Sequence, residues 1–356
     1  MARIVYAVAG EGFGHSSRSH LTGQRLIESG HEVIFAGSNK SLTYLREHYG
    51  NRVKEIFGLT FDYKDGRVHP IKTIKKNILR LPTGDRINRK LFKGFFEEYQ
   101  PDLIISDFEP FSAWWALRNN VPFFSIDHQH MLTHCKIRRP RGCGFSMINA
   151  YMVTRCYYVS ATSYIIVNFF KAPVKRRSAV VAPPVVRPEV LSLKPHSGEY
   201  IVLYTTTGRN KEQLQELLGK FGSLKFHIYG FDECAENGNC IFKERSTSGF
   251  LADVAGSRGV VACAGFSLIS ECMHFKKRML LLPLAGQYEQ FINAYYVQLL
   301  GLGLSRSELN EQSLAEFLAE TEGPMPDDER ILWPSNERFF DVLQQCLSRL
   351  PSPIRI

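Results

Sequence analysis

The 356-residue chain has no uncharged apolar stretch long enough to span a bilayer, which takes about 18 residues. The most apolar segment, 156–170, is shorter and contains Ser, Thr and Asn. The first residues lack the basic, apolar and small-residue regions of a secretory signal peptide. We therefore expect a cytoplasmic protein, one that can dock on the inner face of the membrane without crossing it.

Cysteine is present, but not in a metal-binding or redox pattern. The 8 cysteines include no CxxC pair, and none stands at zinc-ligand spacing from a histidine. Reduced thiols in a reducing compartment are expected. No metal and no cofactor are predicted from these residues.

Acidic residues are scarce in one half of the chain. Residues 1–190 carry 28 Lys and Arg against 15 Asp and Glu, net +13, whereas the remainder carries 16 against 20, net −4. A basic half attracts an anionic partner: a phosphorylated acceptor, an acidic membrane leaflet or nucleic acid. Between residues 90 and 99, three phenylalanines and a tyrosine stand beside two lysines, a composition that can lie at a lipid interface. A solvated, highly charged helix and a pocket for a soluble phosphorylated acceptor are the alternatives. Because no nucleic-acid-binding motif is present, nucleic acid is not an expected partner.

The chain reads as two α/β halves. Short β-branched or aromatic runs alternate with helical stretches up to a proline-rich, aperiodic segment, and the alternation then restarts. We expect an N-terminal domain over 1–170, a linker over 171–195, a second domain over 196–335 and a C-terminal helix in 336–356 that packs back on the N-terminal domain. The expected strands are 4–8, 31–36, 102–106, 122–126, 200–204, 226–229, 259–262 and 279–282, with a helix over 18–29 and a basic elaboration over 64–99.

A glycine-rich turn, GEGFGHSS at 10–17, follows the first strand. Gly12 and Gly14 allow a sharp turn and a close approach to a ligand, and the next helix, expected to begin near residues 16–18, directs its N-terminal amides there. The pattern differs from the dinucleotide fingerprint GxGxxG, and no acidic residue ends the second strand, which argues against NAD. His15 brings a titratable imidazole to this edge, unless it only caps the turn.

Asp107 stands at the end of a buried strand, where an acid is costly unless it is solvated or paired. It can orient His15 by a hydrogen bond, as in a base and its orienting group. The alternative is that Asp107 caps the helix expected to start near Glu109.

Two further segments place polar groups at strand ends. Asp127, His128 and His130 follow the strand at 122–126; a metal site is conceivable, but a polar loop on the acceptor side is favoured. In the second half, the strand–turn–helix start after residue 204 predicts a phosphate cradle, with plain helix capping as the alternative. The cradle residues are Thr206, Thr207, Gly208 and Arg209.

The most specific pattern lies in the second half. CAGFSLISE at 263–271 is followed by an apolar strand and by GQYEQFINA at 286–294. This order resembles the donor-binding half of GT-B glycosyltransferases, of the MurG type and of the plant and antibiotic UDP-glycosyltransferases. The GEGFGH turn resembles their N-terminal G-x-x-GH loop. The resemblance extends from residue 4 to 303 and is strongest over 260–303.

The resemblance implies an α/β fold of two Rossmann-like domains facing each other across a cleft. It implies an inverting, metal-independent hexosyl transfer from a nucleoside-diphosphate sugar, with a bias to UDP, to a hydroxyl acceptor, lipid-linked or an anionic glycan. His15 matches the family's general base, or at least an acceptor-site residue, and Asp107 its orienting aspartate, with Glu11 as an alternative base. On the donor side, Glu271 matches the carboxylate that binds the ribose, and the diphosphate-binding helix start is matched by Gly265, Phe266 and Ser267. The segment that binds the donor sugar is matched by Gln287, Glu289 and Gln290, and Asn293 matches the residue that orders this segment. From the first half, Gly12 and Gly14 are also expected to contact the donor.

Some features depart from the family pattern. The plant HCGWNS core is replaced by ACAGFS at 262–267, and Glu289 stands where Asp or Gln is more frequent, which leaves the donor sugar open. The DxD motif of metal-dependent transferases is missing, since its nearest equivalent at 62–65 has the wrong spacing. The alternatives left open are a UDP-sugar 2-epimerase of the same fold and a catalytically silent nucleotide-sugar-binding protein.

Overall fold

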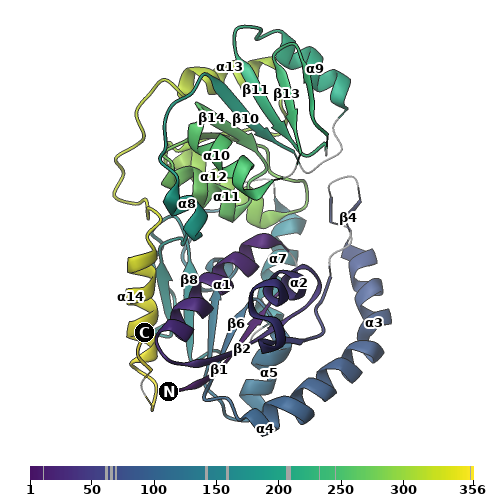
Figure 1. The fold of residues 1–356 in the computed structure, drawn as a ribbon, viewed down its shortest axis with the longest axis vertical. Coiled ribbons are helices and arrows are strands. Elements are labelled where there is room, and N and C mark those ends of the chain that lie inside the picture. The colour runs from purple at the N-terminus through teal and green to yellow at the C-terminus, as the bar shows by residue number, and fades with distance from the viewer. Residues whose placement is uncertain are drawn as a thin grey trace.

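The structure, a computed structural model, describes residues 1–10, 12–60, 63–64, 67–68, 70–140, 143–157, 160–205, 210–231, 233–244, 246–352 and 354–356. Within these residues the chain forms two seven-stranded sheets in succession and one two-stranded ribbon. Figure 1 shows the two sheets one above the other, each covered by helices. The predicted α/β class, with two Rossmann-like units, is confirmed.

The first sheet is parallel throughout and has the order β3-β2-β1-β6-β7-β8-β9. Its chain order reverses between β1 and β6, so the carboxyl ends of these strands form the topological switch point at which open α/β sheets bind ligands. The strands are β1 (Arg3–Val8), β2 (Glu32–Gly37), β3 (Val53–Glu55), β6 (Leu103–Asp107), β7 (Phe123–Asp127), β8 (Ser163–Val167) and β9 (Ala179–Ala182).

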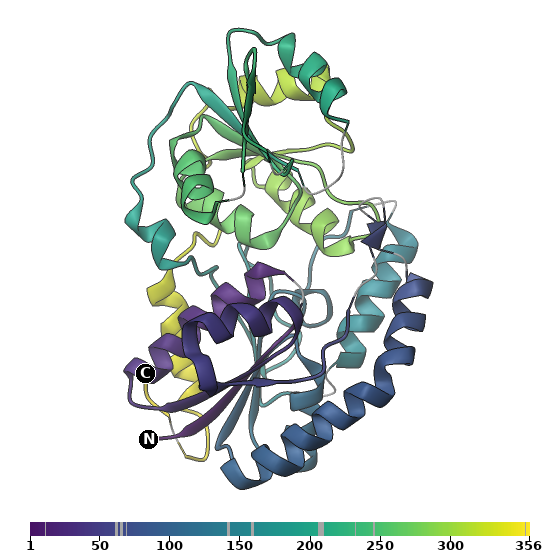
Figure 2. The same ribbon diagram turned by 45° about the vertical axis from the view of Figure 1, so that its right-hand side comes forward.

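Helices and short elements of the N-terminal half surround this sheet. A long arm, α3, runs along its outer edge in Figure 2 and continues through a π-helical turn into α4. The elements are α1 (Phe13–Glu28), α2 (Asn39–Tyr49), a 3-10 turn (Gly50–Arg52), the ribbon β4 (Tyr63–Lys64) and β5 (Arg67–Val68), α3 (Pro70–Leu91), the π turn (Phe92–Phe96), α4 (Glu97–Tyr99), α5 (Pro110–Arg118), α6 (Met131–His134) and α7 (Gly144–Tyr157).

The second sheet has the order β12-β13-β11-β10-β14-β15-β16, parallel except for the β12–β13 pair. Its switch point lies between β10 and β14. The strands are β10 (Tyr200–Tyr204), β11 (Lys225–Tyr229), β12 (Ala235–Asn237), β13 (Cys240–Lys243), β14 (Gly259–Ala262), β15 (Arg278–Leu281) and β16 (Gly303–Ser305). The helices that accompany this half are α8 (Pro188–Ser192), α9 (Lys211–Gly219), α10 (Thr247–Gly256), α11 (Phe266–His274), α12 (Tyr288–Leu299) and α13 (Glu311–Glu320).

The last helix, α14 (Asn336–Leu347), returns to the first sheet, where Figure 1 shows it beside β8. Its Phe339, Leu343 and Leu347 are fully buried in one hydrophobic cluster with strands of that sheet. Burial of an aliphatic or aromatic side chain of this size contributes about 1.5–3 kcal/mol. The C-terminal residues therefore stabilise the N-terminal half.

Each expected strand overlaps an observed one, with its ends shifted by at most one residue. The expected helix at 18–29 begins earlier, at Phe13. The lipid-facing role assigned to the aromatic residues of 90–99 is wrong. Phe96 is fully buried, and Phe92, Phe95 and Tyr99 pack against the core, where apolar rings gain more than at a wet surface. In the described part of the chain, no helix combines the length and the apolar character needed to cross a membrane.

Candidate active site

A cavity of about 450 Å³ opens between the carboxyl ends of the two sheets. The N-terminal half lines it with the β1–α1, β6–α5 and β7–α6 turns and with α7. The C-terminal half lines it with the start of α11 and the segment that leads into α12. The cavity thus touches the switch points of both sheets, which makes it the candidate active site.

His15 and Asp107 meet at the switch point of the first sheet. Gly12, with a φ of 83°, turns the chain so that α1 begins at Phe13 and His15 falls in its first turn. His15 Nδ1 lies 2.6 Å from Asp107 Oδ1, so the predicted hydrogen bond is present. Asp107 does not cap the next helix; Glu109 does, by accepting from two backbone amides of α5.

A third residue, Arg18, contacts this pair. The Arg18 guanidinium donates to both carboxyl oxygens of Asp107, from Nε to Oδ2 at 2.8 Å and from Nη2 to Oδ1 at 2.6 Å. Burial opposes the charge of Arg18, but Asp107 outweighs it and raises the pKa of Arg18 above its usual value. Sequence reasoning missed Arg18, although its position three residues after His15 places both on one face of a helix.

The β6–α5 turn adds an aromatic wall and a second carboxyl group. Phe108 has a φ of 55°, a left-handed conformation that is uncommon for a bulky residue. Its ring stacks near His15, with centroids 6.4 Å apart, and on Tyr157 of α7 at 4.6 Å. Burial raises the pKa of Glu109 to about 7, although hydrogen bonds from Ser112 and the α5 amides oppose this shift. The side of the cavity next to His15 is therefore formed largely by the apolar rings of Phe108 and Tyr157.

On the opposite side, α11 directs its N-terminus at the cavity. Gly265 caps the helix, and Gly265, Phe266 and Ser267 all line the cavity, where the resemblance expects the diphosphate. Ser267 also meets Gly14 of α1, since a Cβ on Gly14 would overlap the Ser267 hydroxyl. The N-termini of α1 and α11 thus approach each other directly.

Glu271 does not face the main cavity. Both Nε and Nη2 of Arg187 donate to Glu271 Oε1, at 2.9 and 2.7 Å, in a small recess beside α1. Burial raises the pKa of Glu271, and Arg187 partly offsets this shift. The carboxylate that the resemblance assigns to the ribose is therefore occupied by an arginine of the connecting segment.

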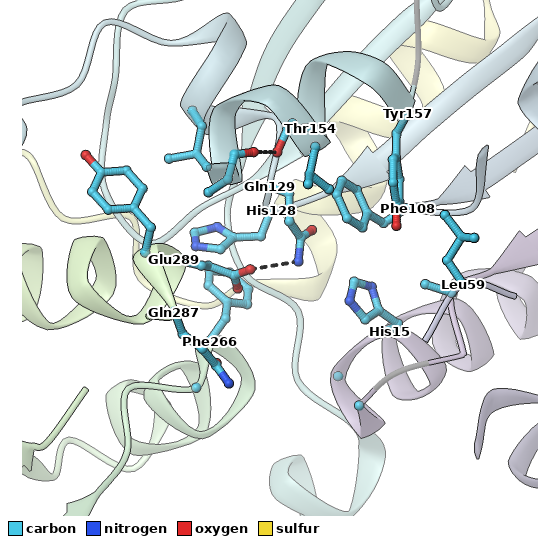
Figure 3. Close-up of a pocket in the computed structure, with 18 of the residues that line it drawn as sticks. His15, Leu59, Phe108, His128, Gln129, Thr154, Tyr157, Phe266, Gln287 and Glu289 are labelled. Carbon is cyan, nitrogen blue, oxygen red and sulfur yellow. Dashed lines mark hydrogen bonds between the residues drawn. The ribbon is translucent and has the colours of Figure 1, made fainter. Parts of the chain in front are cut away.

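The segment before α12 lies partly in the cavity. Gln287 and Glu289 line it, and Gln129 Nε2 donates to Glu289 Oε2 at 3.0 Å across the two halves, as Figure 3 shows. Gln290 turns away: it accepts from the Leu284 amide at 3.0 Å and donates to Gln287 at 2.8 Å. Of these residues, Gln287 and Glu289 are the ones placed to contact a ligand directly.

Of the three residues predicted at the β7–α6 turn, Asp127, His128 and His130, it is His128 that lines the cavity. Its Nε2 lies 2.8 Å from Asn293 Oδ1, and Asn293 in turn donates to the Ala264 carbonyl at 3.1 Å. Asp127 Oδ2 and His130 Nδ1 lie 2.7 Å apart, and both residues are buried. Although burial favours neutral Asp127, His130 holds the pKa of that carboxyl well below its usual value. His128 and His130 do not converge on a metal.

Other predicted site residues fall outside the described part of the chain: Glu11, Thr206, Thr207, Gly208 and Arg209. Among the residues that the structure describes, no group of three or more His, Cys, Asp or Glu side chains is arranged to hold a metal ion.

The architecture is that of known glycosyltransferases. The glycotransferase of kitacinnamycin is similar over 97% of this chain and 94% of its own, with a TM-score of 0.63 at 16% identity. The calicheamicin glycosyltransferase CalG4 covers 99% of both chains with a TM-score of 0.61 at 14% identity. Phytolacca americana UGT2, complexed with UDP-2fluoro-glucose and pterostilbene, covers 90% of both with 0.63 at 15%. The fold is therefore GT-B.

Sequence comparison gives the family. The family model described as Glycosyl transferase family 1 matches residues 2–321, and the chain belongs to this family. An uncharacterized glycosyltransferase of Methanosarcina acetivorans is 32% identical over 134 residues, and one of Methanosarcina mazei is 29% identical over 135. Each match covers 36% of this chain, and the chain spans about a third of the length of either relative.

Proposed function

We propose that the protein transfers a sugar from a nucleoside-diphosphate sugar, UDP-linked by preference, to a hydroxyl acceptor, with inversion at the anomeric carbon. The observation that carries the proposal is the position of the hydrogen-bonded His15–Asp107 pair. It faces the N-terminus of α11 and Glu289 across one cavity between two Rossmann-like sheets. The family and the UDP-sugar in the Phytolacca americana structure support the choice of donor.

The acceptor hydroxyl would bind on the N-terminal side of the cavity. His15 Nε2 accepts its proton as the oxygen bonds to the anomeric carbon, and the bond from that carbon to the diphosphate oxygen breaks. Attack from the side opposite the leaving group inverts the anomeric centre. Glu11 remains an alternative base.

The donor would bind on the C-terminal side. The amides at the start of α11 stabilise the negative charge that develops on the diphosphate, without a metal in the mechanism. Thr206, Thr207, Gly208 and Arg209 are proposed to contact the same phosphates. Gln287 and Glu289 are placed to bind hydroxyls of the sugar, and Glu271 is proposed to bind the ribose after it leaves Arg187.

Two alternatives are less well supported. A 2-epimerase needs several carboxylates in the cleft, but among the described lining residues only Glu109 and Glu289 carry them, and Glu109 caps α5. In a catalytically silent binding protein, the His15 imidazole and its hydrogen bond to Asp107 would have no function at the cavity.

We further propose that the N-terminal half docks on an anionic membrane surface that presents the acceptor. On α3, Ile78, Leu79 and Leu81 are 58%, 71% and 46% exposed beside basic residues of the same helix. On α7, Phe145, Ile148 and Met152 are 75%, 58% and 52% exposed. Both helices lie on the right-hand side in Figure 2. Exposed apolar residues among lysines and arginines are typical of interfacial helices.

A thermal-shift screen over UDP-, GDP- and dTDP-sugars tests the donor assignment. We expect stabilisation by a UDP-sugar, because a ligand that binds only the folded state raises its melting temperature. The absence of a shift with every nucleotide sugar at millimolar concentration would contradict the proposal.

A further inference from the structure

Arg18 contacts both residues of the proposed catalytic pair and is largely shielded from solvent. The residue is 5% exposed and Asp107 is fully buried. Ser19 Oγ donates to Asp107 Oδ2 at 3.3 Å, in addition to the two contacts from Arg18. The hydrogen bonds from Arg18 and Ser19 hold the Asp107 carboxylate in one orientation. Loss of one partner of this buried ion pair would leave an uncompensated charge.

The contacts determine where the imidazole proton lies. A guanidinium has only donors, so both oxygens of Asp107 act as acceptors. His15 Nδ1, 2.6 Å from Oδ1, must then carry the proton and donate it to that oxygen. The unprotonated nitrogen is Nε2, on the ring that projects into the cavity in Figure 3. The contacts of Arg18 with Asp107 therefore impose on His15 the Nδ1–H tautomer, which a general base requires.

The charges also matter. A lone buried carboxylate would stabilise the protonated, inactive imidazolium. Arg18 Nη2 lies 3.4 Å from His15 Nδ1, so its positive charge opposes that protonation. With a neutral imidazole, the three side chains carry no net charge, which suits their burial.

We infer that Arg18 is a positioning residue of the proposed reaction: it holds Asp107 in place and balances its charge, so that His15 presents a neutral Nε2 to the acceptor hydroxyl. This inference rests on the proposed function. As the new bond from oxygen to the anomeric carbon forms, the acceptor proton moves to Nε2, and the electron pair of the broken bond leaves with the nucleoside diphosphate. The imidazolium then returns its proton to solvent.

The pH dependence of turnover tests this role, with Arg18→Met and Arg18→Lys compared. Arg18→Met removes the charge at similar length, so the acidic limb of the rate profile should move up by roughly one pH unit and turnover at neutral pH should fall roughly tenfold. Arg18→Lys keeps the charge, so its acidic limb should stay in place while turnover falls because only one oxygen of Asp107 is held. UDP affinity should not change in either variant.

Three outcomes would overturn the inference. The first is a lower rate in Arg18→Met with an unmoved acidic limb, and the second is an acidic limb that moves as far in Arg18→Lys as in Arg18→Met. The third is a loss of UDP affinity, which would make Arg18 a donor contact. If Arg18→Met does not fold, the tautomer of the His15 ring in the wild type, measured by nitrogen-15 NMR, still tests the inference.

Nitrogen-15 NMR of the histidine rings separates this inference from the proposed function, because it needs no turnover. The His15 signals, identified by their loss in His15→Gln, should show the Nδ1–H tautomer in the wild type. They should titrate at higher pH in Arg18→Met. An Nε2–H tautomer in the wild type would contradict the inference even in an active enzyme. The expected spectra from an inactive protein would support the effect of Arg18 on His15 but reject the proposed function, and with it a role of Arg18 in that reaction.

Discussion

The Arg187 guanidinium occupies one oxygen of Glu271 from a segment that connects the two halves. Glu271 is 5% exposed, so a ligand can reach its carboxylate only if Arg187 moves or shares it. If the ribose binds at Glu271 as proposed, donor binding and this ion pair compete for the same group.

Variants of the pair should act in opposite directions on donor affinity. Glu271→Ala should weaken UDP-sugar binding by about 1–3 kcal/mol, because a charge-assisted hydrogen bond is lost. Arg187→Met should strengthen it by removing the competitor. Titration calorimetry measures both, with Arg306→Met as the matched control, since Arg306 pairs with Glu316 elsewhere in the C-terminal half. Unchanged affinity in Glu271→Ala would place the nucleotide elsewhere.

At this scale, the sequence predicts contacts between strand ends but not the partners of arginines. His15 follows strand β1 and Asp107 ends strand β6, and these strands are neighbours in the sheet. The proximity of the two residues therefore follows from the alternation of elements and the switch-point rule. Arg18 and Arg187 carry no comparable signal, because a long flexible side chain can reach many carboxylates. Their roles depend on packing that only the structure provides.

At the scale of elements, two helix N-termini meet where Gly14 of α1 packs against Ser267 of α11. Gly14 lies inside a helix, where alanine is intrinsically preferred by about 1 kcal/mol. The lack of a side chain at Gly14 is therefore explained by its close contact with α11 and not by a backbone conformation that requires glycine. We expect this contact to influence how closely the two halves approach each other.

Gly14→Ala should keep or raise thermal stability yet lower turnover by roughly tenfold or more, because small displacements of the reacting groups are costly. A double-mutant cycle with Ser267→Ala measures the coupling. Removing the hydroxyl should restore part of the turnover lost in Gly14→Ala. Strictly additive effects of the two substitutions would mean that the contact does not control the approach.

The strands were predictable because buried parallel strands are short apolar runs between turn signals. The helix α3 was not: Pro82 and Gly84 interrupt its pattern, and the segment was predicted only as a basic elaboration. In the structure, a Cβ on Gly84 would overlap the Phe57 ring, so tertiary packing explains a residue that disfavours a helix.

At the scale of the whole molecule, aromatic and polar contacts join the halves. The Phe170 and Tyr296 rings stack with centroids 3.5 Å apart, and the Tyr296 hydroxyl accepts from the Arg138 amide at 2.7 Å. The two-half organisation was predictable from the motifs and the proline-rich segment. The orientation of the halves was not, since it depends on such pairs of residues far apart in the sequence.

The proposed membrane docking involves the whole surface and is tested with vesicles. The protein should sediment with anionic vesicles at low salt and less with neutral ones, each basic residue near the surface contributing up to about 1 kcal/mol. Leu79→Glu and reversal of Lys75 and Lys90 should weaken sedimentation. Leu191→Glu is the matched control, because Leu191 is 52% exposed on α8, on the other side in Figure 1. A protein that stays in the supernatant would point to a soluble phosphorylated acceptor.

The most direct test of the account is the transfer reaction, followed by NMR at the anomeric carbon of a carbon-13-labelled, α-linked UDP-hexose in the presence of lipid and soluble hydroxyl acceptors. For the wild type, we predict UDP release that depends on the acceptor and a β-linked product. For His15→Gln, we predict a loss of turnover of roughly 10²-fold or more with unchanged UDP affinity. An α-linked product, full turnover in His15→Gln, or conversion at C2 without acceptor would contradict the account.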